Sequence, residues 1–511
     1  MFNGDRPSGE DHLLNSKRVR LYLAAVAATV IIGLAGAATI AMASQEGDTR
    51  QPKAPDGQSS SHWIRQFGTP STDGAEGIDH DDEGNIYVVG YTWVGQAALG
   101  GVSGYDAFIN KFDADGNEIW RNNFGTQDSD YAGSVAVSND GSVYVLGRTN
   151  GAFPGQTNIG SEDVFLRKLD SQGNEEWTRQ FGTELRDEPS DVEVDDQGNI
   201  YVAGVTRTAL PGQIKTRNED AYVRKYDSDG NETWTHQFGT TGTDQISHIT
   251  LDNRGHIYVV GPTSGAFPGQ TWAGEYDAYL RKLDVDGNTV WTRQFGTEET
   301  DTAIDVAVDG QGHVYVVGFI RIATTGQRVG VVQNSLAHSF DVDGNNIWNH
   351  EFGTIDEDFA TNVVVDNNGD IYVAGRTGGT FPGQVNFGGN DVFLRKLSSD
   401  NKEIWTYQFG SSAGDNVRDM MLDNAGNLYL AGRTNGVLAG QEQQGLSDAF
   451  LIKLTADFSP ASGPNVIPNG GISCNRLTAK LEGSLSIGWI LMGLMLPALT
   501  LAKLASRGSQ G

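Results

Sequence analysis

The heptapeptide WTRQFGT occurs twice, at residues 177–183 and 291–297, and five close variants complete a strict repeat. Their tryptophans stand at positions 63, 120, 177, 234, 291, 348 and 405. Every step is 57 residues, without an insertion or a deletion. A fixed period of this length indicates that one structural unit is built repeatedly and stacked against its neighbours.

Each unit contains four short segments with strand character. In the unit 130–183, residues 134–147 (SVAVSNDGSVYVLG) form two apolar or alternating runs around an Asn-Asp-Gly turn. A second pair, DVFLRKLD and EEWTRQF, flanks the turn SQGN. Glycine in such a turn supplies the positive φ angle that a tight hairpin needs. Four strands per unit are typical of one blade of a β-propeller.

The sequence therefore predicts an all-β fold, a seven-bladed β-propeller of four-stranded blades over residues 62–458. The alternating WTRQF segment is the expected outermost strand, with its tryptophan packed under the next blade. The first such strand, at 62–67, has no inner strands before it, and the set after Trp405 has no outer strand after it. We expect the N-terminal strand to complete the last blade and close the ring, which removes free sheet edges.

The repeated signatures GN-I-Y-V-x-G, FPGQ and DAF-x-x-K resemble those of the SBBP (seven-bladed β-propeller) repeat family. The resemblance covers about residues 62–458. It implies a secreted or cell-surface bacterial or archaeal propeller, a class that usually has no assigned activity.

Both ends of the chain are apolar. Residues 21–43 form an uncharged run after the basic segment 1–20, long enough for an uncleaved transmembrane anchor. Ala41-Met42-Ala43 also fits a signal-peptide cleavage site, and both readings stay open. Residues 485–502 rise about 27 Å as a helix, a marginal span, and the basic tail 503–511 follows.

The positions of the basic residues predict that both termini are cytoplasmic. The propeller would then lie outside the cytoplasmic membrane, at the cell surface, between the polar linkers 44–61 and 459–484. The second linker carries the single cysteine, Cys474. It is either an incidental thiol beside a tail anchor, a processing or lipidation site, or one half of an intermolecular disulfide.

The net charge of −29 argues against nucleic-acid binding, because no basic stripe is available to neutralise phosphates. An acidic chain attracts cations instead. One aspartate recurs in every unit directly after the FGT turn, and the set comprises Asp73, Asp130, Asp187, Asp244, Asp301, Asp358 and Asp415. These carboxylates are candidate ligands for a metal such as calcium at the channel mouth. The favoured interpretation is that each caps its own turn.

The loop that carries Phe-Pro-Gly-Gln is expected on the same face and is a candidate ligand surface, since long loops on a rigid ring often bind partners. Its candidate residues are Trp93, Phe153, Gln156, Phe267, Gln270, Trp272, Phe381 and Gln384. Trp93, Trp272, Tyr105 and Tyr276 offer stacking surfaces for sugars or peptides. The favoured alternative is that the loop packs against its own blade.

No HExxH, P-loop or CxxC motif is present, and the nine histidines show no ligand spacing. We therefore assign no catalytic residue and expect no cofactor, with calcium left open. The predicted function is a membrane-tethered binding or scaffold module for a cell-surface protein or glycan. The alternative is a carboxylate-based hydrolase or lyase that acts on polysaccharide. The likeness of all seven aspartates favours the binding module.

Overall fold

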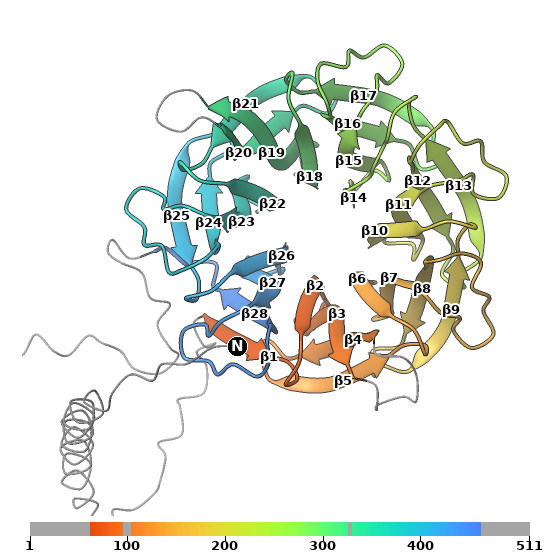
Figure 1. The fold of residues 1–511 in the computed structure, drawn as a ribbon, viewed down its shortest axis with the longest axis horizontal. Helices are drawn as coiled ribbons and strands as arrows, with labels where there is room; N and C mark the ends of the chain where they lie inside the picture. The colour runs from red at the N-terminus through yellow and green to blue at the C-terminus, as the bar shows by residue number, and fades with distance from the viewer. Residues whose placement is uncertain (1–61, 96–103, 325–329, 461–511) are drawn as a thin grey trace, which may run out of the picture. The chain divides into compact units, whose positions relative to one another are not determined.

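The computed structural model describes residues 62–95, 104–324 and 330–460. These residues form seven four-stranded antiparallel sheets arranged as the blades of a ring (Figure 1). The predicted all-β seven-bladed propeller is thus confirmed. The basic segments, the apolar runs 21–43 and 485–502, most of the linkers and Cys474 lie outside the described residues. Within the described ranges, no helix has the length and apolar character needed to cross a membrane.

We number the blades by their innermost strands, which are β2 (Asp73–His80), β6 (Asp130–Val137), β10 (Asp187–Val194), β14 (His248–Leu251), β18 (Asp301–Val308), β22 (Asp358–Val365) and β26 (Asp415–Leu422). The second strands are β3 (Ile86–Val94), β7 (Val143–Thr149), β11 (Ile200–Thr206), β15 (Ile257–Thr263), β19 (Val314–Thr324), β23 (Ile371–Thr377) and β27 (Leu428–Thr434). The third strands are β4 (Gly104–Phe112), β8 (Asp163–Leu169), β12 (Asp220–Tyr226), β16 (Asp277–Leu283), β20 (Gly330–Phe340), β24 (Asp391–Leu397) and β28 (Asp448–Leu454). The outermost strands are β5 (Glu118–Phe124), β9 (Glu175–Phe181), β13 (Glu232–Phe238), β17 (Thr289–Phe295), β21 (Asn346–Phe352), β25 (Glu403–Phe409) and β1 (Trp63–Phe67).

The heptapeptide forms the outermost strand of every blade and packs against the next one. The indole N–H of Trp120, on blade one, donates to the carbonyl of Ser171 in the last hairpin of blade two. Gly173, in the same hairpin, has a φ of 83°, and a Cβ built there would lie 3.2 Å from the Trp120 ring. Glycine therefore suits both the turn and the close approach at this position. The repeated tryptophan is a contact between blades, as predicted.

The ring closes through β1, which pairs with β28 in the register Trp63↔Lys453 to Phe67↔Ala449. Blade seven thus combines the two ends of the propeller, as the sequence predicted. Arg65 extends from this strand to blade one, where its Nε donates to the carbonyl of Gly116 over 2.8 Å.

The apolar core is divided among the seven junctions between blades. At the first junction, Tyr87 and Val89 of blade one pack with Val135, Val145 and Phe153 of blade two. Each junction buries its own cluster of this kind, so the central axis is left to polar side chains.

Blade four departs from the repeat because Pro262 replaces a hydrogen-bond donor in β15. Its missing N–H removes one bond to the innermost strand, and β14 spans only four residues where the other innermost strands span eight. The carbonyl of Gln245 accepts the hydroxyl of Tyr279 instead, over 2.8 Å.

Candidate ligand site at the channel mouth

Two cavities lie along the centre of the ring. One has a volume of about 490 Å³ and the other about 320 Å³, and both are lined by residues from the innermost strands of several blades. Ser134, Asp191, His248 and Asp419 line both cavities. The centre of the propeller is therefore a polar channel, and these four residues lie where its two halves adjoin.

One strand position supplies most of the chemistry in this channel. It lies four residues after the repeated aspartate, and its occupants in blade order are Gly77, Ser134, Asp191, His248, Asp305, Asn362 and Asp419. In six blades the register shifts directly before this residue, as a β-bulge. A bulge disrupts the ladder locally and redirects a side chain, which explains why this position can differ from blade to blade.

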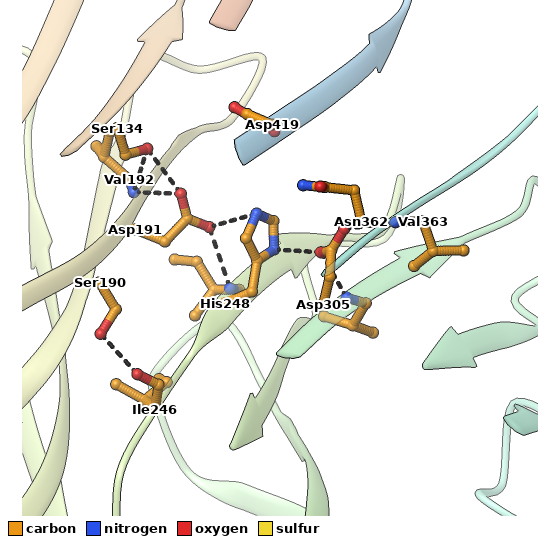
Figure 2. Close-up of polar contacts among 12 residues, drawn as sticks. Ser134, Ser190, Asp191, Val192, Ile246, His248, Asp305, Asn362, Val363 and Asp419 are labelled. Atoms are coloured by element: carbon orange, nitrogen blue, oxygen red, sulfur yellow. Dashed lines mark hydrogen bonds and ion pairs between the residues drawn. The ribbon is translucent and has the colours of Figure 1, made fainter. Parts of the chain in front are cut away.

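His248 lies between two of these carboxylates (Figure 2). Its Nε2 is 3.2 Å from Asp191 Oδ2, and its Nδ1 is 3.0 Å from Asp305 Oδ1. Burial lowers the pKa of His248, but the charges of Asp191 and Asp305 outweigh burial and raise the pKa well above its ordinary value. The imidazole is therefore a cation at neutral pH, held between blades three and five.

The same carboxylates also satisfy backbone N–H groups of the following blade. Asp191 accepts from Ile249 N over 3.1 Å, and Asp305 accepts from Val363 N over 2.7 Å (Figure 2). Asp419 accepts from Ile78 N over 2.9 Å. Burial raises the pKa of Asp419 to about 7, so this carboxyl gains or loses a proton near neutrality. The side chains at this channel position therefore join neighbouring blades, and several of them are also titratable groups at the cavity wall.

An aromatic cluster lies beside the larger cavity, on blades one and two. Tyr91, Tyr105 and Tyr131 are in mutual contact, with ring centroids 5.0–5.5 Å apart, and all three line the cavity. Trp93 packs edge-on against Tyr105 at 4.9 Å. We call these four residues the aromatic cluster.

Charged side chains adjoin the aromatic cluster. The guanidinium of Arg148 lies 4.6 Å from the ring centroid of Tyr131 and pairs with Glu162 at 2.8 Å. Arg418 lies 3.5 Å from Glu76 across the junction of blades seven and one. Burial raises the pKa of Glu76, and the charge of Arg418 opposes that rise. The mouth of the channel thus combines aromatic faces with both signs of charge.

The repeated aspartates lie apart from this cavity wall, buried within their own blades. Each is 0–2% exposed and is the first residue of its innermost strand, except in blade four. One carboxylate oxygen accepts the backbone N–H of the residue four positions earlier over 2.5–2.7 Å, from Thr69, Thr126, Thr183, Thr240, Thr297, Thr354 and Ser411. These are the hydrogen bonds of a turn cap. Among the described residues, no group of three or more His, Cys, Asp or Glu side chains is arranged to hold a metal ion.

The Phe-Pro-Gly-Gln loops are fixed to their own blades. Phe153, Phe267 and Phe381 are 1–2% exposed. In blade two, Phe153 N donates to Gln180 Oε1 and Gln156 Oε1 accepts from Gln180 N. The same pair of bonds joins each loop to its outermost strand in blades four and six, through Gln270 with Gln294 and through Gln384 with Gln408. Of the candidate residues on this face, Trp272 is 47% exposed and Trp93 belongs to the aromatic cluster.

Sequence reasoning missed the channel position. The argument against an enzyme relied on the likeness of the seven repeated aspartates, yet the same strands place Asp191, Asp305 and Asp419 near the axis without sevenfold symmetry. Superimposing the repeats at their 57-residue period would have shown this variable column. The likeness of the repeated aspartates therefore does not argue against carboxylate chemistry at the axis.

Comparison with known proteins identifies the repeat. Six stretches match the SBBP beta-propeller repeat, at residues 62–95, 176–208, 233–268, 290–318, 347–382 and 404–439. The regulatory protein FlaEY of Caulobacter vibrioides is 26% identical over 364 residues. The alignment covers 62% of this chain and 38% of that protein, so the chain spans well under half of its relative.

Three solved structures are similar to this chain at low identity. The Pan2 WD40 domain of Neurospora crassa is 11% identical with a TM-score of 0.45, covering 80% of this chain and 100% of that domain. YCF48 bound to D1 peptide is 11% identical with a TM-score of 0.43, covering 79% and 99%. The polysaccharide lyase Uly1 is 11% identical with a TM-score of 0.44, covering 80% and 95%.

Proposed function

Because the chain carries SBBP beta-propeller repeats arranged as a seven-bladed ring, we propose that it is a binding module that takes up a glycan at the channel mouth. The sugar would enter the larger cavity beside the aromatic cluster. The rest of the ring would serve as a rigid scaffold for this site.

The observation that carries the proposal is where the repeats differ. The tryptophan of the outermost strand and the aspartate of the turn cap recur in all seven units, because each performs the same structural task in every blade. The channel position changes through glycine, serine, aspartate, histidine and asparagine. A scaffold alone needs no such variation, whereas a ligand site needs different groups in a fixed arrangement.

The lining suits a carbohydrate. A volume of about 490 Å³ lies within the range of about 300–1,000 Å³ usual for small-ligand sites. Tyr91, Tyr105 and Tyr131 provide aromatic faces against which the C–H face of a sugar ring can pack. Ser190, Asn362 and other polar side chains provide partners for hydroxyl groups.

We also propose, from the terminal sequences, that the propeller faces the outside of the cytoplasmic membrane and is tethered by one or both apolar segments. A cell-surface glycan or a glycosylated partner protein would then be within reach. Protease digestion of intact cells tests this placement: an outward-facing propeller is cut, and one inside the cell is protected until the cells are lysed.

Thermal unfolding of the full-length chain with a panel of oligosaccharides tests the binding function. A ligand present at about a hundred times its Kd adds about 2.7 kcal/mol to the free energy of unfolding, which raises the Tm measurably. Tyr105→Ala should abolish the ligand-dependent rise if the sugar enters the channel mouth. Trp272→Ala, at an exposed loop away from the cavity lining, is the matched control. A rise that Trp272→Ala abolishes and Tyr105→Ala preserves would place the ligand on the loops instead.

Asp419 supports a second candidate, a polysaccharide hydrolase or lyase. With its pKa raised to about 7 by burial, this carboxyl can donate or accept a proton at neutral pH, as an acid–base catalyst must. His248 is less suited to act as a base, because its raised pKa keeps it protonated. If the module is an enzyme, Asp419→Asn should stop product formation while sugar binding persists. Binding without product formation by the unaltered chain would contradict this candidate.

A further inference from the structure

We infer that the ligand taken up at the channel mouth is an acidic glycan, whose carboxylate or sulfate group is held by Arg148 and Arg418. This inference rests on the proposed binding function and specifies the chemical class of the ligand. It follows from an uneven distribution of charge around the ring.

The position that pairs with the second residue of the innermost strand is basic or phenolic on one side of the ring. Blades six, seven, one and two place Arg376, Arg433, Tyr91 and Arg148 there, in that order. In blades three and five Val205 and Phe319 occupy this position, and in blade four the equivalent residue is Pro262, whose carbonyl accepts from Gln245 N. We call the first four residues the basic arc.

Two members of the basic arc are in direct contact, and the arc shares Tyr91 with the aromatic cluster. Arg433 donates to the hydroxyl of Tyr91 over 3.0 Å, which joins blade seven to blade one. Arg148 lies on the ring of Tyr131, so its guanidinium is oriented before any ligand arrives. A planar guanidinium pairs bidentately with a carboxylate or a sulfate, and a neighbouring tyrosine can hold the sugar ring.

Arg418 adds a further cation to the cavity wall from the innermost strand β26. It is the fourth residue of its strand, and Glu76 occupies the equivalent place in β2, 3.5 Å away. The side chains of Arg418 and Arg148 are 39% and 33% exposed and both line the larger cavity. Arg418 therefore already binds one carboxylate, that of Glu76, at a place on the cavity wall that a ligand can also reach.

The net negative charge of the chain opposes the binding of an acidic sugar, so the position of the arginines matters. At −29 the protein repels anions at long range and attracts cations without specificity. A preference for an acidic sugar can therefore arise only from local groups that oppose the general field. Arg148 and Arg418 supply such cations at the cavity wall. Each is also paired with one carboxylate, Glu162 or Glu76, and both lie beside the tyrosines that would hold the sugar ring.

Calorimetric titration of the full-length chain with four hexasaccharides tests the inference. The probes are hexagalacturonate, its neutral methyl ester, the basic chitosan hexamer and a sulfated hexasaccharide that has no carboxylate. We expect the acid to bind about tenfold more tightly than its ester, as one charge-assisted hydrogen bond allows. Tight binding of the sulfated sugar in place of the carboxylate would identify sulfate as the anion and support the same site.

Single-residue variants separate a loss of charge at the site from a general effect on folding. Arg148→Gln and Arg418→Gln should each weaken binding of the acidic sugar about tenfold and leave binding of the ester unchanged. Glu76→Gln should strengthen binding of the acid, since it removes the carboxylate that shares Arg418. Lys402→Gln, at a cation 79% exposed on the outer surface, is the control and should change nothing.

The outcomes distinguish the two proposals. Equal affinity for the acid and its ester, both lost in Tyr105→Ala, would overturn the acidic preference and leave glycan binding intact. Preference for the chitosan hexamer would overturn it as well. If none of the four sugars bound at millimolar concentration, both proposals would fall together.

Discussion

His248 Nδ1 lies 3.0 Å from Asp305 Oδ1, which joins the innermost strand of blade four to that of blade five. Its other ring nitrogen reaches Asp191 on blade three, so one imidazole bridges three consecutive blades. Pro262 shortens β14 in this blade, and His248 is the first residue of what remains. The ion pairs therefore hold the blade whose innermost strand has the fewest ladder bonds.

His248→Gln should destabilise the propeller by about 1–3 kcal/mol at mildly acidic pH, the usual contribution of hydrogen bonds to a charged group. Because the folded pKa is raised, the contribution is fully present below the unfolded value of about 6.5 and disappears as pH rises through the folded pKa. Urea unfolding at a series of pH values measures the difference between the variant and the unaltered chain. A difference that grew with pH would contradict the assigned ion pairs.

His236→Gln is the matched control, since burial lowers the pKa of His236 on the outermost strand β13. For a histidine with a depressed pKa the sign reverses, because protonation at low pH opposes folding. As pH falls, His236→Gln should therefore become more stable relative to the unaltered chain, whereas His248→Gln should become less stable.

Much of the fold follows from the repeat period, and the site follows from it only in part. Trp120 and Trp63 occupy the same repeat position and each packs against the next blade. Gly173 has glycine equivalents in four other blades and Asn401 in blade six, so the spacing predicted these roles. Arg433 and Tyr91 are 342 residues apart and meet only because the ring closes, so no local pattern could pair them. The bulge that turns Asp191 and Asp305 toward the axis is likewise set by strand pairing, which the sequence pattern does not display.

Tyr279→Phe should cost about 1–3 kcal/mol, because it leaves the carbonyl of Gln245 without the hydroxyl that Pro262 made necessary. Tyr222 occupies the equivalent position in blade three, and its buried hydroxyl has no hydrogen-bond partner among the described residues. Tyr222→Phe should therefore be neutral or stabilising. Chemical denaturation of the two variants side by side measures the contrast.

A double-mutant cycle tests whether Pro262 is the reason that Tyr279→Phe is costly. In a Pro262→Val background the new backbone N–H can bond to Gln245, so Tyr279→Phe should cost less than it does alone. An unchanged cost would show that the tyrosine hydroxyl matters for a reason unrelated to the proline.

Asp130→Asn should destabilise the propeller by about 1–3 kcal/mol, because the charged oxygen accepts both the backbone N–H and the hydroxyl of Thr126. We expect the same loss in calcium and in chelator, as for a turn cap. Thermal unfolding under both conditions measures it. A calcium-dependent rise in Tm that Asp130→Asn and Asp301→Asn remove would instead make the repeated aspartates a cation site.

Trp63→Ala should destabilise the protein by about 3–5 kcal/mol, the usual cost of truncating a buried tryptophan. Trp63 is 6% exposed and packs against the hairpin of blade one at Gly116, so it holds the strand that closes the ring. Loss of β1 would expose the edge of β28, and exposed edges associate. Trp291→Ala is the matched control, because its strand is continuous with the chain on both sides. Urea unfolding combined with light scattering should show that both variants lose stability and that only Trp63→Ala associates; equal association would mean that closure by β1 does not protect that edge.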